Sequence, residues 1–479
     1  MQKAYLILTA IFMGIMLQSC SVNPVTGKKQ LVFMSEEQEI AMGQQADPEI
    51  VAMFGLYEDP TLQKFINEKG QEMAKISHRP NLKYEFKVVD SPILNAFAVP
   101  GGYVYFTRGI MAHFNNEAEF AGVLGHEIGH ITARHSVVQQ RNQILGQIGL
   151  IAGIVLVPEI AQFAEPASAG LGLLMMRFGR DAERQSDELG VEYSAKIGYD
   201  ARQMGKFFNT LERKSSEGGQ GEIPEFLSTH PSPANRSRDV EKLAVEWIAK
   251  LSLNSPDVNR NSYLEKIDGL IYGDDPKQGF LENNVFYHPE LKFQFPVPQG
   301  WSYSNSPQAV QMAPKDGKAI LMMTLAQANT LNAAADSTLS RYQMTTVGRS
   351  NLTINGLPAL ELVADQVSET ASMRTLNYFI QYGGLIYHFL GASATADYSS
   401  YVSAFQNTGK QFRALTDASK LNKKAERVRI KTVAQAGTLK QVLTSFNMPA
   451  ARHEELAILN GMALNEQVAG GTKIKVVGL

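Results

Sequence analysis

Residues 116–135 read NEAEFAGVLGHEIGHITARH, and this stretch decides the kind of domain that the chain forms. We predict a helix over residues 117–135. His126 and His130 are four residues apart on it, so both imidazoles lie on one face and can reach one metal ion. Glu127 lies beside them, where its carboxylate can take a proton from a water molecule that attacks a carbonyl group. An exposed helix face with two unrelated histidines is the alternative interpretation.

A catalytic zinc site needs a third protein ligand and one open coordination position. The best downstream candidate is the stretch RDAERQSD at residues 180–187. Glu183 can complete a set of two histidines and one glutamate. Asp187 lies four residues further on the same predicted helix face, where it can accept the outer N–H of a ligand histidine and fix its tautomer. Two acidic residues at this spacing are often only a solvated helix face. The pair is a candidate because it follows the two histidines.

Composition limits the classes of protein to which the chain can belong. Its 479 residues are 44% apolar and 19% charged, which excludes global disorder and is enough for about three packed domains. A net charge of −2 argues against nucleic acid as a partner. Cys20 is the only cysteine in the sequence, so an intrachain disulfide and a cysteine-based zinc site are excluded.

The N-terminal segment has the pattern of a secretory signal. Lys3 gives it a short positive region, and residues 4–17 form an uncharged apolar run. That run is shorter than the roughly 20 residues that a membrane-spanning helix needs. We therefore expect a signal peptide over residues 1–19.

The letters LQSC at residues 17–20 resemble the bacterial lipobox, in which the cysteine is lipidated and becomes the new N-terminus. This resemblance implies a lipid anchor on Cys20 and a lipoprotein that faces the periplasm. Ser21 follows the cysteine in place of an aspartate, which by the same resemblance implies the outer membrane of a Gram-negative bacterium. A buried cysteine after an ordinary signal peptide is the alternative.

The composition changes after the motif-bearing region. Residues 254–284 are rich in Asn, Asp, Gly and Pro, which marks a domain boundary. Residues 285–392 alternate between strand patterns and turns, and a helix over 398–415 closes that region. We therefore expect an α+β protein in three parts: a mostly helical domain at residues 20–253, a sheet-plus-helix domain at 280–416 and a small α/β tail at 427–479.

Residues 143–157 form a glycine-bearing apolar run that is too short to span a membrane. We expect a buried or lid helix beside the cleft. An interfacial patch that touches a membrane or a membrane-protein substrate is the second interpretation, and a transmembrane helix is the least favoured. The next stretch, AEPASAGLG at residues 164–172, is expected to be a connector that gates access.

Four separated motifs follow one another along the chain. They are NAFAVPGGYVYFTRG at 95–109, NEAEFAGVL running into HEIGHITARH, the pair Glu183 and Asp187, and STHPSP at 228–233. In this order they resemble the zinc endopeptidases of metallopeptidase family forty-eight, the HtpX and CAAX prenyl-protease group. The resemblance covers about residues 23–251 and is closest to the soluble, periplasmic or lipoprotein members.

This resemblance implies a zincin-type, gluzincin-like peptidase domain with one Zn²⁺ per chain. The implied zinc ligands are His126, His130 and Glu183, and the implied general base is Glu127. Residues 97–107 precede the metal helix as a hairpin. Its edge strand would accept the substrate as an added strand, or the hairpin is an ordinary internal one.

His230 is followed by Pro231 and Pro233, which hold a rigid extended loop. In related periplasmic proteases such a histidine approaches the zinc, so His230 joins Glu127 as a catalytic candidate. It would either block the open position or stabilise the oxyanion; a surface-loop histidine is the alternative. For Arg236, surface solvation is favoured over a place in the cleft.

The later parts carry no catalytic pattern. Residues 280–416 resemble, by pattern only, the sheet-plus-helix modules of the photosystem PsbP type. The tail, with AQAGTLKQVL, LAILNGM and GGTKIKVV, resembles a LysM glycan-binding unit, although Gly437-Thr438 stands where that module has Gly-Asp-Thr. The tail resemblance implies peptidoglycan binding, with a role in domain packing as the alternative.

Together these resemblances imply a lipid-anchored zinc endopeptidase that cleaves misfolded or stalled periplasmic and outer-membrane proteins. Its expected partners are those substrates, the membrane and peptidoglycan, with no nucleic acid. Two alternatives come from other classes. One is an envelope-protein assembly chaperone whose proteolysis is auxiliary or latched off by His230. The other is a peptidoglycan-binding structural lipoprotein with a degenerate metal site. The intact motifs argue against such degeneracy.

Overall fold

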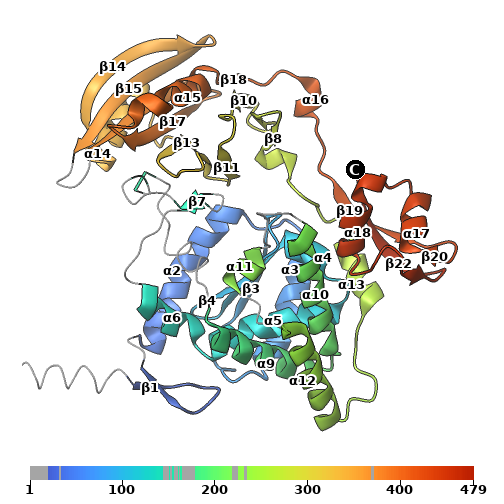
Figure 1. Ribbon diagram of the computed structural model, residues 1–479. Coiled ribbons are helices and arrows are strands. Elements are labelled where there is room, and N and C mark those ends of the chain that lie inside the picture. Colours follow the sequence, from blue (N-terminus) through green and yellow to red (C-terminus); the bar gives the residue numbers. More distant parts are fainter. Residues whose placement is uncertain are drawn as a thin grey trace, which may run out of the picture. The chain divides into compact units, whose positions relative to one another are not determined.

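The computed structural model describes most of the chain in two compact units (Figure 1). The first unit comprises the described residues of 1–144, 168–273 and 426–479, and the second those of 145–167 and 274–425. The signal segment, the connector at 164–172 and the prolines after His230 lie outside the described residues. The described residues are 20–31, 34–143, 150–151, 154–155, 160, 162–163, 178–217, 225–230, 235–367 and 372–479.

Helices make up most of the first unit. They begin at recognisable caps: Ser35 forms a capping box with Gln38, and Asp59 caps a helix whose first residue is Pro60. None of the described helices is both long and apolar enough to cross a membrane. The helices of this unit before its tail are α2 (Glu36–Phe54), α3 (Pro60–Ala74), α4 (Arg108–His113), α5 (Glu117–Thr132), α6 (His135–Gln143), α9 (Arg180–Lys196), α10 (Arg202–Glu217), α11 (Glu225–Thr229), α12 (Arg236–Lys250) and α13 (Arg260–Ile267).

A three-stranded sheet precedes the metal-motif helix. Its order is β3-β5-β4, with β3 (Glu85–Val89) parallel to β5 (Tyr103–Thr107) and β4 (Ala96–Val99) antiparallel to β5. The predicted strand, Pro-Gly-Gly turn and strand are therefore present, and β4 lies at an edge of the sheet. A separate hairpin pairs β1 (Cys20–Val22) with β2 (Lys29–Leu31).

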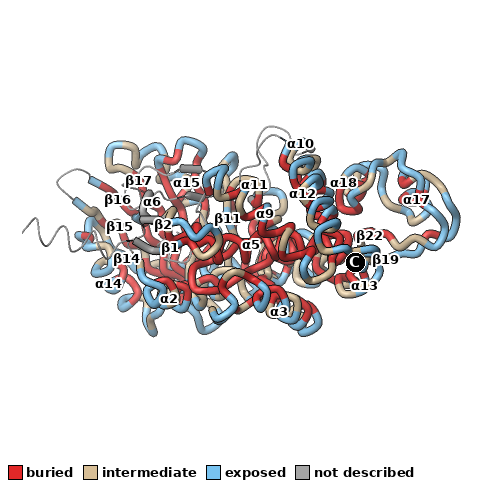
Figure 2. The backbone as a smooth tube through the Cα atoms, turned by 90° about the horizontal axis from the view of Figure 1, so that it is seen from below, coloured by how far each residue is buried: buried red, intermediate tan, exposed pale blue. Residues whose placement is uncertain are grey.

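The metal-motif helix α5 begins where expected and ends earlier than predicted. Asn116 caps it by accepting a hydrogen bond from the Glu119 backbone N–H. The predicted helix over 117–135 stops at Thr132, because Arg134 adopts a left-handed backbone with φ of 58° and α6 then begins at His135. In Figure 2 the trace around α5 has the colour of buried residues. Every residue of α5 is buried.

The tail belongs to the first unit. Lys475 is fully buried there, and its Nζ donates to the backbone carbonyls of Ala112 and Phe114 at 2.8 and 3.0 Å. The expected two helices between short strands are present. They are β19 (Arg427–Thr432), β20 (Gly437–Thr438), α17 (Leu439–Ser445), the 3₁₀ turn η2 (Ala450–Arg452), α18 (His453–Leu459), β21 (Gln467–Val468) and β22 (Lys473–Gly478), with β19 paired to β22 and β20 to β21.

The second unit is built on an antiparallel seven-stranded sheet of order β11-β12-β13-β17-β16-β15-β14. A four-stranded sheet of order β18-β10-β9-β8 accompanies it. The expected helix over 398–415 ends at Lys410 and is followed by a short strand. The elements are η1 (Pro276–Gln278), β8 (Phe280–Glu282), β9 (Val285–His288), β10 (Phe293–Pro296), β11 (Ser302–Asn305), β12 (Ala309–Ala313), β13 (Ala319–Leu325), α14 (Leu331–Arg341), β14 (Thr345–Ile354), β15 (Leu357–Val367), β16 (Ser372–Tyr382), β17 (Leu385–Ala394), α15 (Tyr398–Lys410), β18 (Arg413–Ala414) and α16 (Ala418–Leu421).

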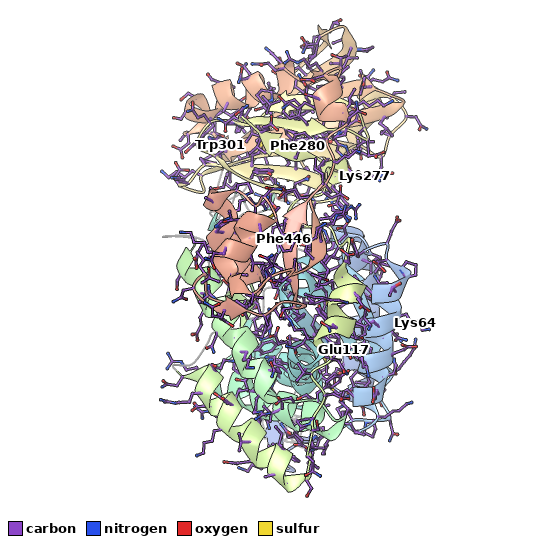
Figure 3. All side chains as sticks on the ribbon, turned by 90° about the vertical axis from the view of Figure 1, so that its right-hand side faces the viewer. Lys64, Glu117, Lys277, Phe280, Trp301 and Phe446 are labelled. Atoms are coloured by element: carbon purple, nitrogen blue, oxygen red, sulfur yellow. The ribbon has the colours of Figure 1, made fainter. Side chains whose placement is uncertain are left out.

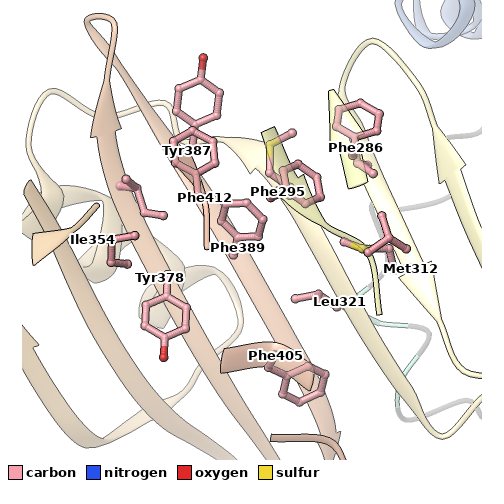
Figure 4. Packing of buried hydrophobic residues seen from close by; sticks show 14 of the residues in the cluster. Phe286, Phe295, Met312, Leu321, Ile354, Tyr378, Tyr387, Phe389, Phe405 and Phe412 are labelled. Atoms are coloured by element: carbon pink, nitrogen blue, oxygen red, sulfur yellow. The ribbon is translucent and has the colours of Figure 1, made fainter. Parts of the chain in front are cut away.

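Aromatic residues fill the core between this sheet and α15. Figure 4 shows the cluster that contains Phe295, Tyr387, Phe389 and Phe405. Phe295 and Phe389 pack edge to face, with ring centroids 5.1 Å apart. The strand patterns and turns of residues 285–392 therefore correctly predicted a sheet-rich region.

The expected lid helix over 143–157 is wrong for the described residues of that run. Residues beyond Gln143 form a small hairpin of β6 (Leu150–Ile151) and β7 (Ile154–Val155). β-Branched residues suit an extended backbone, and β6 lies against β11 and β12 of the second unit. Further along, Ile160 and Phe163 are buried in the core of the same unit.

Candidate metal centre

Four buried side chains meet in the middle of the first unit. His126 and His130 come from α5, Glu183 comes from α9, and His230 directly follows α11. One donor atom from each lies within 4.8 Å of the others. The structure thus brings the three ligand candidates together with His230.

The distances within this cluster are those of donors that surround one point. His126 Nε2 lies 3.0 Å from His130 Nε2 and 3.3 Å from His230 Nδ1. Glu183 Oε1 lies 3.0 Å from His230 Nδ1 and 3.4 Å from His130 Nε2. His230 is 1% exposed, so it is not a surface-loop residue.

Glycines let α5 and α9 approach closely enough to bring these side chains together. A Cβ on Gly125 would lie 3.0 Å from the Cα of Gly190, and one on Gly190 would lie 2.9 Å from the carbonyl oxygen of Gly122. Real Cβ atoms essentially never lie within 3.0 Å of such an atom. A larger side chain at either position would therefore push the helices apart. The helix that carries His126 and His130 therefore contacts the helix that carries Glu183 and Asp187 through backbone atoms.

Asp187 and Arg236 hold the outer side of the cluster. Asp187 Oδ1 lies 2.9 Å from His126 Nδ1, the nitrogen that faces away from the cluster. Arg236 donates from Nη2 and Nε to the two Asp187 oxygens at 2.7 and 2.8 Å, and its Nη2 lies 3.2 Å from Glu183 Oε2. The expectation of a solvated Arg236 is wrong: it is 2% exposed and stacks on the ring of Phe208.

Charges across the cluster set the protonation of its members. Burial alone would raise the pKa of Glu183, but His230, His130 and His126 outweigh it and hold that pKa well below its usual value. Burial lowers the pKa of His130 well below its usual value. Burial also opposes charge on Asp187, yet Arg236 and His126 hold its pKa low. An anionic Glu183 and a neutral His130 are the states that bind metal.

The carboxylate of Glu127 is buried without a hydrogen bond from the described residues. It is fully buried, and neither of its carboxylate oxygens has a hydrogen-bond partner among the described residues. His230 Nε2 is 3.7 Å from Oε1, which is too far for a hydrogen bond. Burial raises the pKa of Glu127.

The donor set fits a single zinc ion. Imidazole nitrogens and a carboxylate oxygen are the ligands that zinc takes in catalytic sites. Buried carboxylates are normally hydrogen-bonded, so the unpartnered oxygens of Glu127 indicate a partner that the described chain does not supply. His126, His130, Glu183 and His230 therefore form a cluster in which one ion would complete the polar contacts.

Aromatic rings line this cluster. His130 stacks on Phe178 with ring centroids 4.0 Å apart, and His230 stacks on Phe226 at 4.6 Å. The backbone N–H of Phe226 donates to the carbonyl of Leu94, just before β4. These contacts hold His230 in the cluster and keep water away from its donors.

Sequence reasoning missed one polar residue beside the cluster. His135 Nδ1 lies 3.0 Å from His130 Nδ1, and His135 Nε2 lies 2.9 Å from Gln185 Oε1. The only signal in the sequence was a third histidine just past the metal motif.

The buried donor set is of the kind with which metallopeptidases hold zinc. Residues 60–244 match the family model "Peptidase family M48", the family that the four motifs resemble. The lipoprotein branch and the LysM-like tail stay predictions.

Two curated relatives illustrate the match. The chain is 30% identical over 234 residues to a beta-barrel assembly-enhancing protease of Yersinia pestis, covering 46% of this chain and 47% of that protein. It is 31% identical over 182 residues to the mitochondrial metalloendopeptidase OMA1 of Arabidopsis thaliana, covering 38% of this chain and 36% of that protein. The match thus spans less than half the length of these relatives.

Among solved structures, that of a cyanobacterial PsbP from Synechocystis covers 27% of this chain and 91% of its own. The TM-score is 0.24 and the identity 14%, which is too weak a likeness to assign the second unit.

Proposed function

We propose that the chain is a zinc-dependent endopeptidase of the cell envelope. The proposed ligands are His126, His130 and Glu183, and the proposed general base is Glu127. The observation that carries this proposal is the buried cluster of three imidazoles and one carboxylate, beside a second carboxylate that has no partner of its own among the described residues.

A bound zinc ion would supply a Lewis acid that activates water and polarises the scissile carbonyl. The chain's own residues do the rest. Glu127 takes the proton of the attacking water and passes it to the leaving amine. Burial raises the pKa of this carboxyl, which suits both halves of that transfer. Asp187 accepts the outer N–H of His126 and fixes the orientation of that ring.

We propose that His230 is a latch. Its Nδ1 lies among the other donors, where it would fill the position that a catalytic zinc site leaves open. A histidine that moved out of the cluster would instead be available to donate to a developing oxyanion. The latched arrangement also favours a second candidate function, an assembly chaperone whose proteolysis is auxiliary. The intact cluster weighs against a purely structural, peptidoglycan-binding lipoprotein.

We propose unfolded or misassembled proteins of the periplasm and outer membrane as substrates. Support comes from relatives whose name is beta-barrel assembly-enhancing protease. The proposed location is the periplasmic side of the outer membrane through a lipid on Cys20, with peptidoglycan contact through the tail. Cys20→Ala should release the protein from membranes, and full retention in the outer-membrane fraction would contradict the anchor.

The activity is tested with the purified full chain. We expect about one zinc per chain and cleavage of casein that a chelator abolishes and added zinc restores. Zinc binding without cleavage, even for a His230→Ala variant, would favour the chaperone. A chain that binds no zinc would contradict the proposed function altogether.

A further inference from the structure

Two imidazoles touch on the outer side of the donor cluster. The Nδ1 atoms of His130 and His135 lie 3.0 Å apart, with ring centroids at 5.0 Å and an interplanar angle of 74°. His135 is 8% exposed. Its Nε2 faces Gln185 Oε1 at 2.9 Å, and Ser186 Oγ lies 3.2 Å from its Nδ1. His130 thus has a polar partner on the side that faces away from the cluster.

An unbroken helix would not allow this contact. Five residues advance about 500° around a helix, which would place His135 roughly 140° away from His130. The left-handed backbone of Arg134, with φ of 58°, ends α5 and turns His135 back toward it. A non-glycine residue in this conformation is strained, so other contacts must offset the strain.

Those contacts come from the N-terminal helix α2. Arg134 Nε donates to Glu39 Oε2 at 2.8 Å, and Glu39 also accepts from Arg79 Nη1 at 2.7 Å. Arg79 Nη1 in turn donates to the carbonyl of Ile131 at the end of α5. Glu39 and Arg79 are buried. A buried ion-pair network therefore fixes the helix break that delivers His135.

The direction of each hydrogen bond follows from the geometry. His130 Nε2 faces the cluster, 3.0 Å from His126 Nε2 and 3.4 Å from Glu183 Oε1. Its lone pair is available there only if the proton of the neutral ring is on Nδ1. That N–H then donates to His135 Nδ1, which leaves the proton of His135 on Nε2, where it donates to Gln185 Oε1.

We propose that His135 and Gln185 are positioning residues that hold His130 in the tautomer with a free Nε2 lone pair. This inference rests on the proposed zinc site. It assigns the two histidines of the motif different supports: the anionic Asp187 behind His126 and a neutral imidazole–amide pair behind His130. The two ligands therefore differ in basicity, because a carboxylate partner makes an imidazole a stronger electron-pair donor to the metal.

The test is zinc affinity of the purified full chain, measured by competition with a chelator of known affinity. His135→Phe keeps a ring in the same place and removes both nitrogens, and it should weaken zinc binding about 10–100-fold. Gln185→Leu should weaken it as well, whereas Gln185→Glu keeps an acceptor oxygen and should bind zinc at least as tightly as the wild type. The control is His388→Phe, which removes a buried imidazole from the second unit and should leave the affinity unchanged.

Wild-type affinity in His135→Phe would overturn the inference. So would equal losses in Gln185→Leu and Gln185→Glu, because a packing role does not distinguish an acceptor from its absence. If His135→Phe fails to fold, the Gln185 pair decides, since that side chain is only half-buried. Failure of the proposed function is a separate result: the wild type itself would then bind no zinc.

Discussion

The two ends of α5 bury acidic side chains in opposite ways. In the first turn, Glu117 (labelled in Figure 3) accepts hydrogen bonds from Tyr199 Oη at 2.9 Å, Ser262 Oγ at 2.9 Å and Lys266 Nζ at 3.1 Å. About three turns further on, Glu127 is more deeply buried and bonds to no described residue.

This difference separates a carboxylate that the fold satisfies from the carboxylate that we propose as the general base. The partners of Glu117 come from two other parts of the chain, Tyr199 after α9 and two residues of α13, so hydrogen bonds within the fold compensate for its burial. Glu127 is left without such compensation, which costs folding free energy and is tolerated where an external group completes the site. The same substitution at the two positions should therefore have opposite consequences.

Glu127→Gln should have the largest effect on activity. We expect casein cleavage to fall by about 10²–10⁴-fold, because the amide cannot take a proton from water. Zinc content should stay at the wild-type level, and thermal stability should be equal or higher, since a buried unpaired charge is removed. Parallel measurements of zinc, melting temperature and turnover check this, and loss of zinc would show that Glu127 is a ligand.

Asp187→Asn should weaken zinc affinity or activity by about 10–100-fold. The amide still fills the volume, but it no longer carries the charge that Arg236 and His126 contact. Chelator competition measures the affinity. An Asp187→Asn protein that matched the wild type would remove Asp187 from the support of the site.

His230→Ala should raise casein turnover several-fold at equal zinc occupancy, because the proposed latch would no longer fill the open position. Self-cleavage should rise with it. A fall of about 10²–10³-fold would instead assign His230 to oxyanion stabilisation. Turnover equal to the wild type would exclude both roles.

Glu117→Gln is the matched partner of Glu127→Gln and should have the smallest effect on chemistry. It should lower the free energy of unfolding by about 1–2 kcal/mol, because the charged hydrogen bond to Lys266 is lost. Zinc affinity should not change. Urea unfolding measures the stability, and a Glu117→Gln protein with impaired zinc binding would contradict the division between the two ends of the helix.

Much of the candidate site could be predicted from the sequence because its spacing is local. His126 and His130, like Glu183 and Asp187, are four residues apart, and helix geometry alone places each pair on one face. The two strands around the Pro-Gly-Gly turn are likewise a local pattern, and the structure contains them.

The parts that could not be predicted depend on distant residues. The end of α5 at Thr132 depends on Glu39 in α2, far earlier in the chain, which holds Arg134. The sequence favours a solvated Arg236 because nothing near it in the chain indicates that Asp187 is its partner. The run at 143–157 had the apolar character of a helix, but β6 is placed by strands more than 150 residues later.

The buried Lys475 of the tail has a practical consequence for dissecting this protein. Its Nζ donates to carbonyl oxygens at the end of α4, directly before the helix that carries the metal motif. Val428 of β19 also exchanges backbone hydrogen bonds with Gly269 and Leu270. A fragment cut after residue 273 would expose those carbonyls and a face of apolar side chains to water. The boundaries that sequence motifs suggest for an isolated catalytic fragment are therefore the wrong ones to clone. An expression fragment needs residues 426–479 supplied with it, on the same chain or as a second polypeptide.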